Sequence, residues 1–376
     1  MQSLHRSTAA ELTDASDMQQ LSYSNLAELF LQEHDAAANA PSSRAAIDPR
    51  NSEPVVYSSA RRRRPVDYNR HVGDTKAHAD PGCIICAGKT TRIVDLAELS
   101  EGFTFINKNL YPAVWPASES SRESGKSDLA FPAEEVRGLH FLQWTSSIHD
   151  HEWHTMPLAD ARIVISRLAI LEKQLLSTSS SAMPSNADFG DPDGYSGFVS
   201  IIKNGGAEVG GSLEHSHQQI IFSNLMPRRI MENWRFQQEH GIPFSQHILH
   251  TTPPNLVLRE YETAVLLIPT FMRRPGDMFL LVKDTRKRYL HQLSPGELRD
   301  VSRGWQDAIS AIHSFMPALG RPTAYNVTTL NGPGAGLHFA FLPYTQETGG
   351  FEQLGLSVCQ AQPAEMAEII RSQHMP

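Results

Sequence analysis

The chain reads Asn204-Gly-Gly-Ala-Glu-Val-Gly-Gly-Ser-Leu-Glu-His-Ser-His217-Gln-Gln-Ile-Ile-Phe222 across the segment that decides its fold. The apolar end of this segment and its alternation predict a β-strand that leaves a glycine-rich turn. Alternate residues of a strand share one face, so His215, His217 and Gln219 are expected to point the same way. Three polar side chains on one face of an apolar strand indicate a site.

The glycine-rich turn has the composition of an anion cradle. Gly210 and Gly211 let backbone amides approach a phosphate closely, and Ser212 adds a hydroxyl donor. A neutral imidazole is a good nucleophile toward phosphorus, which predicts phosphoryl-transfer chemistry at His217. The alternative interpretation is a polar edge strand that carries two solvated histidines.

A pair of cysteines, Cys83 and Cys86, predicts a zinc knuckle that presents two thiolates to one tetrahedral ion. There is no second such pair, so two histidines must complete the site. His215 is one candidate, and the turn around His149 and His151 offers the other. The alternatives are a redox-active pair or two buried thiols.

Two segments of the chain follow the same order of expected elements. Each has strands, a long helix (156–176 and 294–315), a strand, a glycine turn and a last strand. In the second segment 264–268, 278–282, 325–330 and 337–342 are the expected strands. Helices are too few for a parallel series, so the sequence predicts an α+β fold of two fused units with mainly antiparallel sheets and flanking helices.

The expected organisation is an N-terminal extension (1–54), a first unit with the knuckle and His217 (55–225) and a second, degenerate unit (226–376). Within the extension, 21–34 is expected to form an amphipathic helix and 36–54 a linker. Polar stretches at 117–127 and 177–196 are expected to be surface insertions.

Composition excludes several classes of protein. The 376 residues carry a formal net charge of −8, which argues against a nucleic-acid binder. The only dense basic run, Arg61–Arg64, is short. There is no apolar stretch of membrane-spanning length and no signal-peptide pattern, and the three cysteines suit a reducing cytoplasm.

These motifs together resemble the galactose-1-phosphate uridylyltransferases, a branch of the histidine-triad superfamily with two fused copies of its α+β unit. The tract ending His-Ser-His217-Gln-Gln resembles the family's H-P-H-G-Q tract, and Cys83-Ile-Ile-Cys86-Ala-Gly resembles its zinc knuckle. Further matching segments are Ser59–Pro65, Phe105–Ala113, the His149 turn, Leu337–Pro343 and Gly349–Glu352.

The resemblance implies a nucleotidyltransferase that acts on a nucleotide sugar and a sugar 1-phosphate by a ping-pong mechanism. His217 would become nucleotidylated, and Gln219 would hold the phosphoryl oxygens of the intermediate. The implied substrate-binding residues are Arg61, Arg64, Asn109, Asn204, Gly210, Gly211 and Ser212. The implied ligands of one structural zinc are Cys83, Cys86, His149 and His215, with His149 preferred to His151 by its spacing to Met156. The family also commonly forms homodimers.

Departures from the family pattern widen the range of functions that the resemblance allows for this chain. Ser216 replaces the usual proline and resembles the ADP-glucose phosphorylase type, in which inorganic phosphate is the acceptor; a hydrolase would use the same intermediate. In the second unit Gly336 and Asn233 stand where metal ligands would be, so no second metal is expected. The alternative from another class is a non-catalytic nucleotide-binding protein.

Overall fold

The computed structural model describes residues 18–32, 38, 40, 43–48, 53–58, 60, 82–116, 134–177 and 194–375. Most of both expected insertions, and both Arg61 and Arg64, lie outside these residues.

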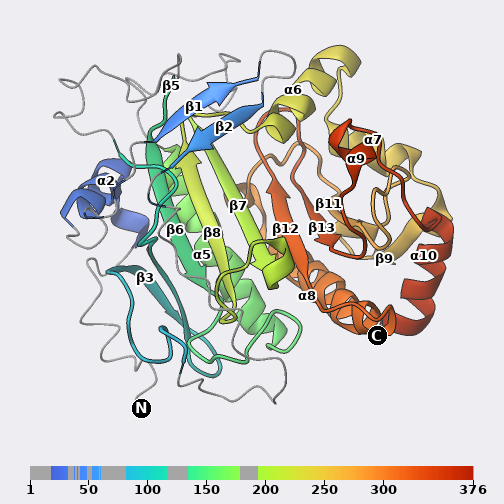
Figure 1. The fold of residues 1–376 in the computed structure, drawn as a ribbon, viewed down its shortest axis with the longest axis horizontal. Helices are drawn as coiled ribbons and strands as arrows, with labels where there is room; N and C mark the ends of the chain where they lie inside the picture. The colour runs from blue at the N-terminus through green and yellow to red at the C-terminus, as the bar shows by residue number, and fades with distance from the viewer. Residues whose placement is uncertain are drawn as a thin grey trace.

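A ten-stranded antiparallel sheet forms the centre of the molecule (Figure 1). Its order is β3-β4-β6-β8-β7-β12-β13-β11-β10-β9. The strands are β3 (Ile93–Glu98), β4 (Phe103–Lys108), β6 (Gly138–Trp144), β7 (Phe198–Gly205), β8 (His217–Ser223), β9 (Val257–Glu260), β10 (Ala264–Leu267), β11 (Met278–Val282), β12 (Tyr325–Leu330) and β13 (His338–Pro343). The predicted α+β class with antiparallel pairing is confirmed.

The order of the strands shows the internal repeat. From the centre outward, the first half runs β7-β8-β6-β4-β3 and the second runs β12-β13-β11-β10-β9. The two halves meet where β7 pairs with β12, with Ile202 opposite Thr328. Each half therefore places its last two strands at the centre of one continuous sheet, and His217 and His338 begin corresponding strands, β8 and β13.

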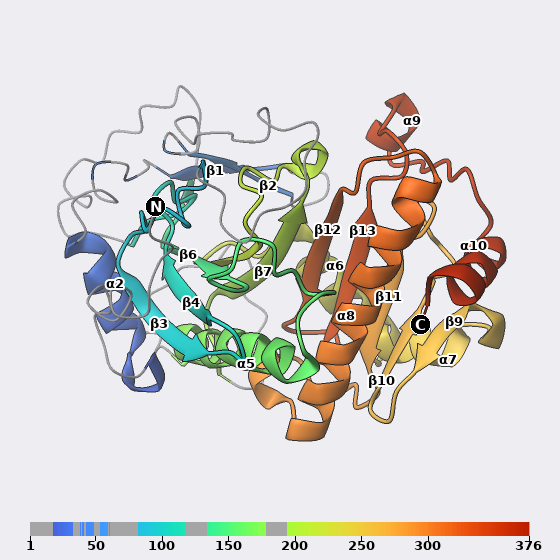
Figure 2. The same ribbon diagram turned by 90° about the horizontal axis from the view of Figure 1, so that it is seen from below.

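Two long helices, α5 (Leu158–Leu176) and α8 (Pro295–Ala318), lie side by side on one face of the sheet (Figure 2). The start of α8 follows from its sequence, because Ser294 Oγ accepts from the Glu297 amide while Glu297 Oε2 accepts from the Ser294 amide at 2.7 Å. Trp305 of α8 packs edge-on against Phe339 and Phe341 of β13. The main core lies between these helices and the sheet.

The described parts of the N-terminal segment belong to the folded body. The helix α2 (Tyr23–Gln32) lies within the expected 21–34, and its Phe30 is fully buried against Phe141 of β6. The expectation of a linker over 36–54 is wrong at 44–47, which form β1 (Arg44–Ile47). This strand pairs with β2 (Pro54–Tyr57) and β5 (Glu134–Glu135), because cross-strand hydrogen bonding outweighs the weak strand propensity of its alanines.

Smaller helices cover the other parts of the second half. They are α6 (Arg228–His240), α7 (Phe244–Thr251), α9 (Gly350–Gln353) and α10 (Pro363–Ile369). Short 3-10 or π turns occupy Met18–Gln20, Ala207–Val209, Pro254–Leu256, Leu290–Gln292 and Ile370–His374. Among the described residues, no helix combines the length and apolarity that a bilayer crossing requires.

Candidate active site and metal cluster

His217 stands at the first position of β8, opposite Trp144 of β6. Two residues further along the strand, Gln219 lies opposite both Leu142 of β6 and Ile202 of β7. Directly opposed residues of antiparallel strands point to the same face, so His217 and Gln219 share the face that α5 and α8 leave uncovered. The predicted common face of these two residues is therefore present.

The His217 imidazole is held in one tautomer. Its Nδ1 lies 2.8 Å from the carbonyl oxygen of His215, and because a carbonyl only accepts, Nδ1 must donate. The Nε2 atom then carries the lone pair. The ring also packs against Trp144 at a centroid distance of 5.0 Å, and Trp144 is itself fixed by donating to Asn107 Oδ1 at 2.9 Å.

A cavity of about 550 Å³ opens in front of His217. It is lined by His217, Gln219 and Trp144, by Ser212 from the turn, and by Asn107 and Asn109 from the end of β4. Its volume lies in the range of small-molecule sites, and its lining combines an apolar wall with a few polar groups, as such sites commonly do.

The residue His215 precedes β8 and turns its ring toward the cysteine pair. Its Nδ1 lies 3.6 Å from Cys83 Sγ and 3.7 Å from Cys86 Sγ, and His149 Nδ1 lies 3.5 Å from Cys86 Sγ. The four ligand atoms all lie within 4.8 Å of one another. A tetrahedral zinc with bonds of about 2.3 Å to sulfur and about 2.0 Å to nitrogen separates such atoms by roughly 3.5 Å. The spacing therefore fits a zinc-type site.

The surroundings of the cluster support metal ligation. His215 Nε2 donates to the Ser146 carbonyl at 2.8 Å, which leaves Nδ1 deprotonated toward the cysteines. Burial raises the pKa of Cys83 to about 12, so a bound cation is what would hold this sulfur as a thiolate. His151 lies elsewhere, 3.9 Å from a Glu101 carboxylate oxygen. The structure thus places His149, and not His151, beside the cysteines.

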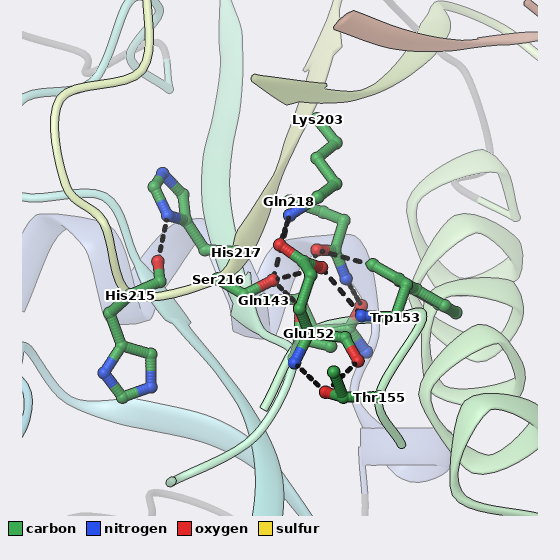
Figure 3. A network of polar contacts seen from close by, with 10 residues as sticks. Gln143, Glu152, Trp153, Thr155, Lys203, His215, Ser216, His217 and Gln218 are labelled. Carbon is green, nitrogen blue, oxygen red and sulfur yellow. Dashed lines mark hydrogen bonds and ion pairs between the residues drawn. The ribbon is translucent and has the colours of Figure 1, made fainter. Parts of the chain in front are cut away.

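Between the two histidines, Ser216 points away from both imidazoles into a buried polar network (Figure 3). Its hydroxyl accepts from Lys203 Nζ at 2.9 Å and donates to Glu152 Oε1 at 2.9 Å. Thr145 Oγ1 lies 2.8 Å from both Ser216 Oγ and Gln218 Oε1. The network joins the turn that follows His149 to the strand that carries His217.

An ion pair closes this network. Lys203 Nζ lies 3.0 Å from Glu152 Oε2, with side chains only 2% and 14% exposed. Burial raises the pKa of Glu152, but the charge of Lys203 and the hydrogen bonds from Trp153, Lys203 and Ser216 outweigh it and lower the pKa to about 2. The carboxylate is therefore ionised at all physiological pH values.

Comparison with known proteins shows the family of the chain. The sequence profile of the galactose-1-phosphate uridyl transferase N-terminal domain matches residues 32–227, just over half of the chain. The chain belongs to the galactose-1-phosphate uridylyltransferase family.

Individual relatives are distant. The enzyme named galactose-1-phosphate uridylyltransferase from Thermotoga maritima is 25% identical over 63% of this chain, and that from Rattus norvegicus is 26% identical over 68%. The matched regions span 65% and 64% of those two relatives.

Solved structures share the fold. A uridylyltransferase superposes with a TM-score of 0.65 at 16% identity, covering 88% of this chain and 97% of its own. An ADP-glucose phosphorylase from Arabidopsis thaliana superposes with a TM-score of 0.60 at 18% identity, covering 88% of this chain and 99% of its own. These similarities show that the galactose-1-phosphate uridylyltransferase fold extends over both halves of the chain.

Some residues that the resemblance to this family implied lie away from the cavity. Asn204 does not line it and instead accepts from Asn326 Nδ2 at 2.8 Å, across the junction of the two halves. The amides of Gly210 and Gly211 donate to the carbonyls of Ala207 and Gly206, which closes the 3-10 turn. Both amide hydrogens are thus used within the turn in this conformation, and a phosphate-binding role for Gly210 and Gly211 stays a prediction.

The structure also places Asn109 and three residues that the sequence does not single out. Asn109 lines the cavity and is buried, and its side chain bonds the Tyr111 amide and the His140 ring at 2.9 and 3.1 Å. His140 and Lys203 are buried and the Glu152 side chain is 14% exposed, and the sequence singles out none of the three. They carry no pattern of their own, and only the fold brings His140 to Asn109 and Glu152 to Lys203.

Proposed function

We propose that the chain is a nucleotidyltransferase that acts on a nucleotide sugar and a sugar 1-phosphate through a nucleotidyl-His217 intermediate. The observation that carries this proposal is the His217 tautomer, because the Nδ1 contact with the His215 carbonyl leaves the Nε2 lone pair on a residue that lines the cavity. The two curated relatives bear the name of such an enzyme, which supports the same chemistry.

The proposed reaction has two steps. His217 Nε2 forms a bond to the α-phosphorus, and the bond from this phosphorus to the oxygen of the departing sugar 1-phosphate breaks. An oxygen of the second sugar 1-phosphate then attacks the same phosphorus and displaces the imidazole. Gln219 and Ser212, which line the cavity, would donate to the phosphoryl oxygens, and Asn109 would orient the nucleotide.

Zinc is the metal proposed for Cys83, Cys86, His149 and His215. Four protein ligands close a tetrahedral coordination sphere, so the ion would serve structure and supply no activated water. His215 would then be fixed by the metal at its ring and would fix His217 through its carbonyl oxygen.

The test uses nucleotide sugars that are radiolabelled at the α-phosphate, with UDP-glucose and ADP-glucose as the first two. We expect an acid-labile adduct of one label per chain, on the peptide that contains His217, and none in His217→Gly. His247→Gly, on the remote helix α7, is the matched control and should label normally. A His217→Gly variant with full turnover would refute the proposal.

A phosphorylase is the second candidate, and Ser216 is the observation that favours it. The Ser216 hydroxyl bonds Lys203 and Glu152 in the network described above. The proline that is usual in the family has no hydroxyl and could not make these bonds. An ADP-glucose phosphorylase is among the proteins that share the fold. Chasing the labelled adduct with inorganic phosphate, glucose 1-phosphate, galactose 1-phosphate or water alone identifies the acceptor, since only the true one releases the label rapidly.

A further inference from the structure

A second cavity, of about 320 Å³, lies in the other half of the sheet. Its floor includes Thr328 of β12 and His338 and Ala340 of β13. Gln219, Ile202, Thr328 and Ala340 are successive opposed residues across β8, β7, β12 and β13. The two cavities therefore open on the same face of the sheet, one in each half, and we call the second one the second-half pocket.

The walls of the second-half pocket depend on close packing at a glycine loop. Gly334 and Gly336 have φ of +75° and +54°, and a Cβ at these positions would collide with the backbone of Asn233 and with Ser245 Oγ. The absence of side chains lets α6 and α7 approach the loop, and the Phe244 amide donates to the Gly334 carbonyl at 3.1 Å. The loop thereby brings Asn233 and Phe244 to the pocket.

Aromatic rings form the apolar side of the pocket. Phe244 and Phe279 pack against His338 at centroid distances of 5.9 and 5.7 Å, and Phe236 and Phe271 each pack against Phe244. All of these rings line the cavity, and Phe271 is 44% exposed. Such walls suit a flat, apolar-faced ligand.

The His338 ring repeats the arrangement at His217. Its Nδ1 lies 2.8 Å from the Gly336 carbonyl and so donates, which leaves Nε2 as an acceptor. Burial lowers the pKa of His338 to about 4, so the ring is neutral. This neutral ring offers an acceptor to whatever fills the pocket.

Two buried polar atoms on the lining have no hydrogen-bond partner within the described part of the chain. They are Asn233 Nδ2, a donor, and Asp277 Oδ1, an acceptor, on side chains only 8% and 3% exposed. Buried polar groups in folded proteins are nearly always paired, so these orphaned atoms, which lie just beneath the cavity surface, favour a ligand that reaches them when their side chains turn toward the cavity. Such a ligand must carry both an acceptor and a donor.

The charged side of the pocket favours an anion. Arg229 is bonded to Glu232 at 2.8 Å, whereas the Arg273 guanidinium makes no hydrogen bond or ion pair at close range with any described residue. Burial and the nearby Arg229 lower the pKa of Arg273, whereas the carboxyl groups of Asp277 and Glu232 act in the opposite direction. Arg273 is exposed, so its guanidinium is accessible to a bound anion, which would offset the repulsion from Arg229.

We propose that the second-half pocket binds a nucleoside monophosphate, with the base between the phenylalanines and the phosphate on Arg273. A nucleobase has flat apolar faces and presents donors and acceptors at its edge, which matches Asp277, His338 and Asn233. The pocket has no counterpart of Gln219, because Ala340 stands in the corresponding place, so it is a binding site without group transfer. This inference holds whichever acceptor the His217 site uses.

The test is the stoichiometry of AMP and UMP binding to the full-length protein by isothermal titration calorimetry. We expect Arg273→Ala and Asn233→Leu each to bind one equivalent fewer than the wild type, or to weaken that equivalent by at least 10-fold. Arg286→Ala is the matched control, because the Arg286 side chain is 89% exposed and, among the described residues, bonds Asp284 alone, and it should bind as the wild type does. Asn233→Leu removes a donor that has no hydrogen-bond partner among the described residues, so this variant is expected to fold. It keeps the test informative if Arg273→Ala does not fold.

Two further measurements make the outcome decisive. Adenosine and inorganic phosphate, titrated separately, should each bind this site at least 10-fold more weakly than AMP. Labelling of His217 by nucleotide sugar should be unchanged in Arg273→Ala, so that failure here is distinct from failure of the proposed function. Equal stoichiometry and affinity in all variants, or inorganic phosphate that binds as tightly as AMP, would overturn the inference.

Discussion

Lys203 Nζ lies 3.0 Å from Glu152 Oε2, and both side chains bond the hydroxyl of Ser216. This pair joins β7 to the turn after His149, so it connects the strand region of His217 with the region of the metal cluster. Its buried position determines how it responds to mutation.

We expect Glu152→Gln and Lys203→Met each to lower the free energy of unfolding by about 3–5 kcal/mol, because each leaves an unpaired buried charge. The double variant should lose much less than the sum, since it retains neither charge. Urea denaturation of the four proteins measures this coupling. Glu260→Gln, which removes an exposed partner of Lys283, is the control and should change stability little. Additive losses would contradict the buried pair.

The low pKa of Glu152 predicts a pH dependence of stability. The folded-state pKa is about 2 against an ordinary value of 4.5, so between these values the unfolded state binds more protons. The stabilisation from Glu152 is present above pH 4.5 and is lost as the pH falls through 2. It amounts to about 3 kcal/mol. The wild type should therefore show a steeper loss of stability with acid than Glu152→Gln over this range, and parallel profiles would refute the assignment.

Ser216→Ala should affect turnover more than folding. The ion pair remains, so the loss of unfolding free energy should be about 1–2 kcal/mol. Because Ser216 fixes the backbone next to His217, kcat should fall between about 10- and 100-fold with little change in KM. Steady-state kinetics with nucleotide sugar measure the effect. Ser166→Ala, which removes only a local bond to the Ile163 carbonyl of α5, is the control and should leave kcat unchanged.

Metal content gives a separate prediction. Elemental analysis should find about one zinc per chain, and Cys86→Ser and His149→Asn should lose it and melt at a lower temperature. Cys359→Ser and His151→Asn are the matched controls, since neither residue belongs to the cluster. Normal zinc in His149→Asn, or loss of zinc in His151→Asn, would show that the ligand set is wrong.

Much of the fold is predictable because its signals are local. The strands 278–282 and 325–330 lie where the run of apolar and β-branched residues indicates them, and the start of α8 follows from the Ser294–Glu297 capping pair. The strand β1 escapes prediction, because its pairing with β2 and β5 is a tertiary property and its residues carry weak strand propensity.

The candidate site likewise has parts that local motifs predict and parts that depend on the fold. His217, Gln219 and the cysteine pair lie within compact motifs, and the spacing of Cys83 and Cys86 predicts a metal site beside the alternatives of a redox-active pair or two buried thiols. The roles implied for Gly210 and Gly211 stay predictions, because the turn uses their amides internally in this conformation, and this depends on how the 3-10 turn closes.

The sequence by itself determined which reactive groups the chain carries and the plan of its fold. These are an imidazole beside a glycine turn, two thiols at knuckle spacing, and a duplicated α+β unit. Only the tertiary structure decided between His149 and His151, placed the Lys203–Glu152 pair behind Ser216, and revealed the second-half pocket. The physical reason is that spacing along a strand or turn is local, whereas distances between residues far apart in the chain depend on sheet register and helix packing, which no single motif encodes.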